Sequence, residues 1–135
     1  MTDKNDDLIA EMGELRGRVT GVTGVVVSAV DGLLLAADPG GGIDGVDGEC
    51  LSALAAAALG LAHRGGAATG RNGLRWSTAR YGDGYLVMFP VGDMGVLTLL
   101  GSGDLDLAGL DGVCERAVAR IDRLLTAPRT PAAQG

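Results

Sequence analysis

Aromatic and basic side chains are scarce in this chain of 135 residues. It has one Trp, two Tyr and one Phe, and Lys4 is its single lysine. Its 11 basic and 17 acidic residues give a formal net charge of −6. Proteins that bind nucleic acids usually carry a basic stripe, so we expect no nucleic-acid partner. With so few aromatics, the core must consist mainly of Val, Leu, Ala and Met.

Cysteine and histidine are equally rare, which limits the available chemistry. Cys50 and Cys114 belong to no Cys-x-x-Cys pair, and both fall in expected helices beside apolar neighbours. We expect them to be buried free thiols, although the sequence leaves a disulfide between them open. One histidine, His63, two distant cysteines and scattered carboxylates form neither a metal-ligand pattern nor a hydrolytic triad. We therefore expect no metal, no cofactor and no enzymatic activity.

Neither the first residues nor the apolar runs of the sequence suggest a membrane segment. Its first seven residues include three aspartates and are mostly polar, unlike a signal peptide. The longest apolar run, residues 51–62, is too short to span a bilayer. We expect a soluble, cytoplasmic protein without membrane insertion. Its length predicts one domain, residues 1–127, followed by a disordered tail, residues 128–135.

Glycine is abundant, with 24 residues, and three of them match a nucleotide-binding pattern. Gly40, Gly42 and Gly45 form a Gly-x-Gly-x-x-Gly motif. That motif indicates dinucleotide binding only inside a βαβ unit, with an acidic residue about 20 positions further on. Here it follows a hairpin and lacks that residue, so we interpret it as a flexible connection. No Gly-x-x-x-x-Gly-Lys motif is present, so the chain is not itself a P-loop hydrolase.

The strongest local signal is a β-hairpin at residues 22–38. Asp31-Gly32 suits a tight turn, and the apolar runs beside it predict strands at 24–29 and 33–37. Before the hairpin, apolar residues recur at helical spacing and predict a helix at 6–17. The chain therefore begins with a helix and two strands.

A second helix is predicted at residues 47–64, capped by Asp47 and ended by Gly65-Gly66. Its middle is apolar around nearly the whole circumference. Such a helix is buried on more than one side. One side can lie on the sheet, and a second copy of the chain is the simplest partner for the other.

The second half of the chain predicts three strands, at 73–80, 85–90 and 95–100, and a helix from Asp104 or Asp106 to Thr126. Short turns between these strands indicate an antiparallel meander. The strand at 73–80 is polar, so it is either a protected edge or half of a strand pair across a dimer. Its Trp76 suits a core or a partner interface, whereas Phe89 suits the core.

This order of elements resembles the roadblock/dynein-light-chain family, in particular its actinobacterial members, over about residues 5–126. The resemblance rests on Val25-Val-Val-Ser28, Asp31-Gly-Leu-Leu-Leu-Ala36, an Ala-rich helix with Gly60, Tyr85-Leu-Val-Met-Phe89 and Val96-Leu-Thr-Leu-Leu100. It implies an α+β fold, an α/β sandwich of profilin-like shape with the order α-β-β-α-β-β-β-α. The five-stranded antiparallel sheet would carry the middle helix on one face and the terminal helices on the other.

The resemblance also implies a non-enzymatic homodimeric scaffold that binds a small Ras-like GTPase and modulates its nucleotide state or recruitment, often beside a sensor-kinase-like protein. Middle helices would pack together and third strands would pair into a ten-stranded sheet. The residues expected at that dimer interface are Leu51, Leu54, Ala55, Ala58, Leu59, Ala62, Arg75, Trp76 and Ser77. Those expected to meet a partner are His63, Arg64 and Arg71, and we do not assign Arg64 as an arginine finger. The alternative is a profilin-like sensory module that binds a small ligand.

Overall fold

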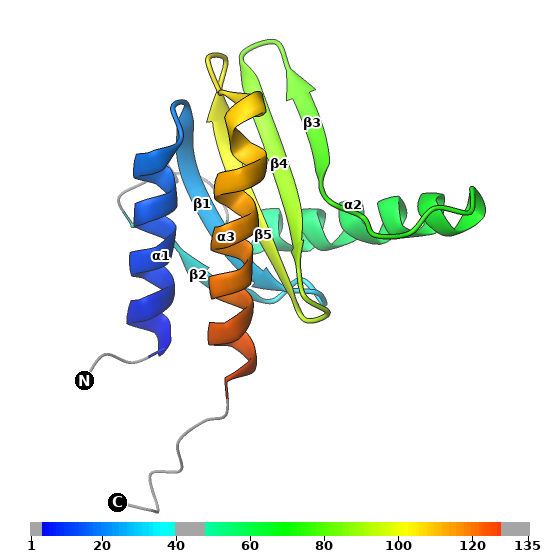
Figure 1. The fold of residues 1–135 in the computed structure, drawn as a ribbon, viewed down its shortest axis with the longest axis horizontal. Helices are drawn as coiled ribbons and strands as arrows, with labels where there is room; N and C mark the ends of the chain where they lie inside the picture. The colour runs from blue at the N-terminus through cyan, green and yellow to red at the C-terminus, as the bar shows by residue number, and fades with distance from the viewer. Residues whose placement is uncertain (1–3, 40–47, 128–135) are drawn as a thin grey trace, which may run out of the picture.

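The computed structural model describes residues 4–39 and 48–127 (Figure 1). The elements follow the order α-β-β-α-β-β-β-α, and the five strands form one antiparallel sheet with the spatial order β2-β1-β5-β4-β3. Both findings confirm the predicted fold class. The bounds are α1 (Lys4–Arg18), β1 (Val22–Ala29), β2 (Leu34–Ala37), α2 (Gly48–Ala68), β3 (Ser77–Tyr81), β4 (Gly84–Val91), β5 (Gly95–Ser102) and α3 (Leu107–Thr126).

The helices form two layers on opposite faces of the sheet, as predicted. Helices α1 and α3 lie side by side in front of the sheet in Figure 1, and α2 crosses behind it. α1 packs on β1 and β2, whereas α3 packs on β4 and β5. We call the face that carries α1 and α3 the terminal-helix face. No helix within the described residues is both long and apolar enough to cross a membrane.

Strand alternation divides the core into two parts of unequal size. Val27 and Leu97, which lie opposite each other in β1 and β5, belong to the larger core under α1 and α3. Met88 and Val96 point the other way and belong to a smaller core under α2. Because successive strand residues face opposite sides, a strand that is apolar on both sides serves both layers.

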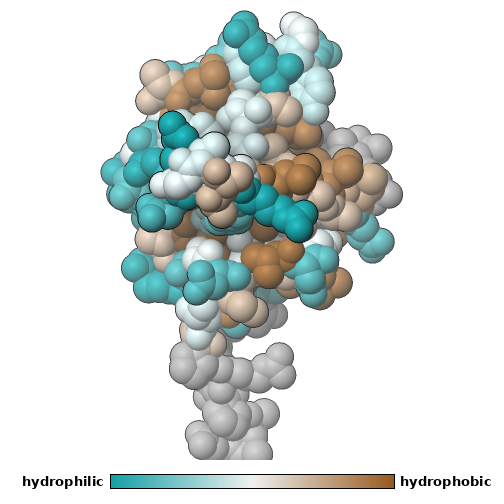
Figure 2. Space-filling model, turned by 90° about the vertical axis from the view of Figure 1, so that its right-hand side faces the viewer, coloured by the Kyte–Doolittle hydropathy of each residue, from teal (hydrophilic) through white to brown (hydrophobic). Residues whose placement is uncertain are grey.

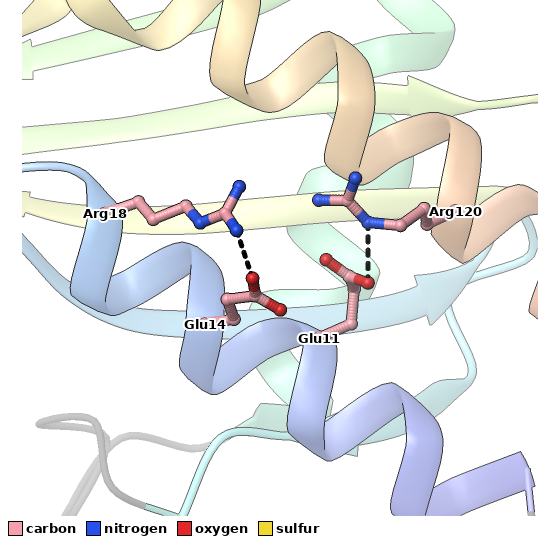
Figure 3. Close-up of polar contacts among 4 residues, drawn as sticks. All are labelled: Glu11, Glu14, Arg18 and Arg120. Atoms are coloured by element: carbon pink, nitrogen blue, oxygen red, sulfur yellow. Dashed lines mark hydrogen bonds and ion pairs between the residues drawn. The ribbon is translucent and has the colours of Figure 1, made fainter.

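The two terminal helices are joined by an ion pair (Figure 3). The Nε of Arg120 in α3 donates to Oε1 of Glu11 in α1 at 2.8 Å, and this hydrogen bond raises the pKa of Arg120. A second pair, Arg18 with Glu14, lies within α1 at the surface. The first contact holds α1 and α3 together as one layer.

The first hairpin forms where the sequence predicts it. Gly32 has a φ of +94°, a value that suits glycine, and Oδ1 of Asp31 accepts from the backbone N–H of Leu33 at 3.1 Å. The predicted cap Asp47, the glycine motif of residues 40–45 and the tail 128–135 lie outside the described residues.

Two predicted boundaries differ from the structure by four residues. Helix α2 does not end at Gly65-Gly66 but continues to Ala68, because the left-handed residue that ends it is Gly70, with a φ of +73°. The third strand begins at Ser77 rather than near residue 73. Arg75 and Trp76 therefore lie before the strand and are positioned by tertiary contacts instead of sheet pairing.

Candidate interaction surface

Helix α2 presents two apolar faces with different surroundings. On the inner face, Ala55 and Leu59 are buried against β4 and β5. On the outer face, Leu54 is 61% exposed and Leu61 is 67% exposed. Ala57 is exposed as well, and its spacing from the two leucines places all three side chains on one side of the helix. We call Leu54, Ala57 and Leu61 the outer α2 face.

Figure 2 looks at the side of the molecule where β3 and the C-terminal end of α2 lie. Hydrophobic side chains form several brown patches there, separated by hydrophilic ones. A mixture of apolar and polar surface is typical of interfaces between folded proteins.

The α2 residues expected at a dimer interface divide between the two faces. Leu51, Ala55 and Leu59 are buried within the chain itself, so their burial needs no second copy. Leu54 faces outwards, and the remaining two are half-buried, namely Ala58 and Ala62. Three of the six expected α2 residues are therefore buried in the protomer interior.

Sequence reasoning missed Ala57 and Leu61. A helix that is apolar on nearly every side gives no hydrophobic stripe from which to read its orientation. Once Leu54 is known to face outwards, helical spacing finds both residues, since they follow it at i+3 and i+7.

The end of α2 and the chain that follows it line an open cavity of about 590 Å³. The backbone N–H of Arg71 donates to the Gly66 carbonyl at 2.7 Å, which turns the chain back along the helix. Nη1 of Arg71 donates to the Thr69 carbonyl at 3.4 Å. His63 and Arg71 both line this cavity, whereas Arg64 is exposed and does not. The structure thus brings together two of the three residues expected to meet a partner.

Arg75 and Trp76 are held on the terminal-helix face. The Trp76 ring lies 6.0 Å from the Phe89 ring, centroid to centroid, at an interplanar angle of 49°. Nη2 of Arg75 donates to Oδ1 of Asp111 in α3 at 2.8 Å, and this hydrogen bond raises the pKa of Arg75. The Arg75 guanidinium also lies 5.9 Å from the centre of the Trp76 ring. These contacts place both residues beside α3 and away from the outer α2 face.

Among the described residues, strand β3 forms one edge of the sheet and pairs only with β4. Ser77, the third expected interface residue of this region, lies opposite Met88 and so faces the α2 layer. Thr78 lies opposite Val87 on the terminal-helix face. The outer edge of β3 leaves backbone groups without strand partners, which is the arrangement that a second strand can complete.

The cysteines differ from the prediction that both are buried. Cys50 is exposed in the first turn of α2, and Cys114 is buried in α3; no disulfide joins them. Burial, and next the negative charge of Asp111, raise the pKa of Cys114 to about 12. Over residues 4–39 and 48–127, no three His, Cys, Asp or Glu side chains are grouped so that they could hold a metal ion.

Comparison with known proteins gives one family and a consistent fold. The sequence model of the Roadblock/LC7 domain matches residues 8–101. A Roadblock/LC7 domain from Streptomyces avermitilis is 22% identical, with a TM-score of 0.77 over 92% of this chain and 98% of its own. Myxococcus xanthus MglB is 16% identical, with a TM-score of 0.80 over 90% of this chain and 97% of its own. The gliding protein MglB from Thermus thermophilus is 12% identical, with a TM-score of 0.77 and 92% of both chains covered. Comparison with curated proteins gave no significant match.

Proposed function

Because the chain belongs to the Roadblock/LC7 domain family, we propose that it is a non-enzymatic homodimeric scaffold for a small Ras-like GTPase. In this proposal the dimer binds the GTPase, changes its nucleotide state or its recruitment, and acts in the cytoplasm. A sensor-kinase-like protein is a further proposed partner. The resemblance to bacterial family members supports these partners, and the surface of α2 supports the dimer.

The observation that carries the dimer is the outer α2 face. Leu54 and Leu61 are more than half exposed, although the opposite side of the same helix is anchored in the core. Burying a leucine side chain contributes roughly 1.5–3 kcal/mol, so covering both in each copy favours association. The small Ala57 between them allows a second α2 to approach closely. A two-fold axis through this face would make the contact self-complementary.

The edge of β3 supports the second half of the proposed dimer. If two copies pair along β3, their sheets become one sheet of ten strands. Exposed Thr78 and Arg80 keep that edge polar while it is unpaired, which discourages random strand addition.

Sedimentation velocity on the full chain tests the dimer. We expect a dimer at micromolar concentration, and a monomer for the double variant Leu54→Glu/Leu61→Glu, since four carboxylates would meet at the interface. Leu107→Glu is the matched control, because Leu107 is also exposed but lies on the opposite face of the sheet. A wild-type monomer, or a double variant that remains dimeric, would contradict the proposal.

The cavity beside His63 and Arg71 supports the alternative, a sensory module that binds a small ligand. Its volume of about 590 Å³ lies within the range of small-molecule sites. A ligand that binds only the folded chain raises its melting temperature. A metabolite that does so in the wild type but not in Arg71→Ala would favour the sensory module over the scaffold.

A further inference from the structure

The described residues leave part of the terminal-helix face uncovered beside α3. Helix α3 packs on β4 and β5, and neither it nor α1 packs on β3 (Figure 1). The uncovered surface lies between α3 and the segment that begins with Trp76. The side chains there do not belong to the outer α2 face, which is on the other side of the sheet.

Two cavities open on this surface beside Trp76. The larger, of about 220 Å³, lies between Trp76, Val87 and Phe89 of β4, and Leu107 and Leu110 of α3. The smaller, of about 160 Å³, shares Trp76 and Phe89 with it and is more open to solvent. We call the two together the Trp76 groove.

The apolar side chains at the rim of the groove are open to solvent. Trp76 and Leu107 are each 42% exposed, although both stand beside buried residues such as Phe89. The larger cavity is lined mainly by apolar atoms and has room for one large apolar side chain. The rim therefore offers a place for an anchor residue of a partner.

The α3 side of the groove is acidic. Asp111 and Glu115 both line it, and Arg75 is the single basic side chain among the lining residues. Arg75 forms an ion pair with Asp111 at 2.8 Å. The hydrogen bond to Asp111 and the negative charge of Asp111, and to a lesser degree that of Glu115, raise the pKa of Arg75. Two carboxylates against one guanidinium leave this wall with a net negative charge, in a chain whose overall charge is −6.

We propose that the Trp76 groove binds a basic amphipathic helix of a partner protein, which inserts one large apolar side chain beside Trp76 and places Lys or Arg near Asp111 and Glu115. A helix in this position would lie alongside α3 and extend the layer of helices over β3 and β4. The proposal rests on the groove alone and does not depend on dimerisation through α2 or on a GTPase.

Selection from a library of random linear dodecapeptides on the immobilised full chain tests it. We expect enriched peptides to combine a large apolar residue with Lys or Arg. Because Trp76 is the only tryptophan, a synthetic copy of such a peptide should change the tryptophan emission of the protein directly. Titration of that emission gives the dissociation constant.

Matched variants locate the binding. Leu107→Lys and Glu115→Lys, both at exposed positions, should each weaken peptide binding roughly tenfold or more. Glu115→Gln keeps the size of the side chain and should weaken it less. Leu54→Glu/Leu61→Glu should leave the dissociation constant unchanged. Because that double variant tests the proposed dimer, failure of the groove and failure of the dimer remain distinguishable.

Other results would overturn the proposal. These are no enrichment, enrichment of acidic peptides, or binding that both groove variants leave intact. If removal of residues 128–135 changes the emission of Trp76, the chain fills its own groove. Emission that depends on protein concentration would instead assign the groove to a second copy.

Discussion

Arg16 and Asp38 form an ion pair, with 2.5 Å between Nε and Oδ2, that ties α1 to the end of β2. The Asp38 side chain is only 3% exposed. A carboxylate withdrawn from water in this way relies on its partners, because an uncompensated buried charge is costly. The pair therefore links the first helix directly to the edge strand β2.

Removing the cation of this pair should destabilise the fold. We expect Arg16→Ala to lower the free energy of unfolding by about 1–3 kcal/mol, since Asp38 loses a charged hydrogen-bond donor. Arg18→Ala is the control: its pair with Glu14 is exposed on both sides, and we expect a loss below about 0.5 kcal/mol. Urea denaturation at neutral pH measures both. Equal losses of unfolding free energy in the two variants would show that the burial of Asp38 does not strengthen its ion pair.

Glycine substitutions test the unexpected length of α2. Gly65 is exposed within the helix, and a methyl group there would meet nothing within 4 Å. We expect Gly65→Ala to raise the free energy of unfolding by roughly 0.5–1 kcal/mol, because alanine favours helix more than glycine does. If the helix ended at Arg64, the same change would be destabilising.

Gly84→Ala should have the opposite effect. A methyl group at Gly84 would overlap the carbonyl oxygen of Gly101 in the neighbouring strand. We expect a loss of about 1–3 kcal/mol, since two hydrogen-bonded strands cannot separate without breaking their pairing. Thermal unfolding of Gly65→Ala, Gly84→Ala and the wild type, compared under one condition, gives the sign of each change.

The order of elements follows from local patterns, whereas the two layers are expected from the resemblance to the roadblock family. The Asp31-Gly32 turn fixes the first hairpin. The apolar stripe of the last helix shows which side of that helix faces the sheet. Its buried residues are Leu110, Cys114, Ala117 and Ile121. These signals span only a few residues, so they can be read without knowing the rest of the fold.

The interaction surface depends on contacts that are distant in sequence. The side of α2 that faces outwards could not be read from a helix apolar on nearly every side. Trp76 matched a strand pattern, yet its position is set by the contact with the Phe89 ring. The position of Arg75 is set by Asp111, which lies 36 residues further along the chain. Gly65-Gly66 resembled a helix end, but a glycine ends a helix only where it turns left-handed, as Gly70 does.

The two cysteines should differ in reactivity. Cys50 is exposed, whereas burial raises the pKa of Cys114 to about 12 from the ordinary value of 9.0. Since the thiolate is the reactive form, we expect a thiol reagent at pH 8 to label one cysteine per folded chain and both in urea. Rapid labelling of both thiols in the folded chain would contradict the packing of α3.

The same shift predicts a loss of stability in base. Below pH 9 the Cys114 thiol is protonated in the folded and unfolded chain alike. Between pH 9 and about 12 the unfolded chain loses this proton while the folded chain keeps it, so stability falls as the pH rises. Cys114→Ala should flatten this part of the profile, which urea denaturation at pH 8, 9 and 10 measures. An unchanged slope would assign the effect to other groups.

Substitutions at the end of α2 should separate GTPase binding from dimerisation. His63 and Arg71 line one cavity and are exposed, so we expect His63→Ala/Arg71→Ala to remain dimeric. If the GTPase contacts this region, the double variant should bind it roughly tenfold more weakly, because arginine is often a dominant contact in interfaces. The measurement is affinity capture from a lysate of the source organism with a GTP analogue or GDP in excess, read by mass spectrometry, with Arg18→Ala as the control.

A small GTPase recovered in one nucleotide state by wild type and control, but not by the double variant, would support the scaffold. A stable dimer that recovers no GTPase in either state would favour the sensory module instead.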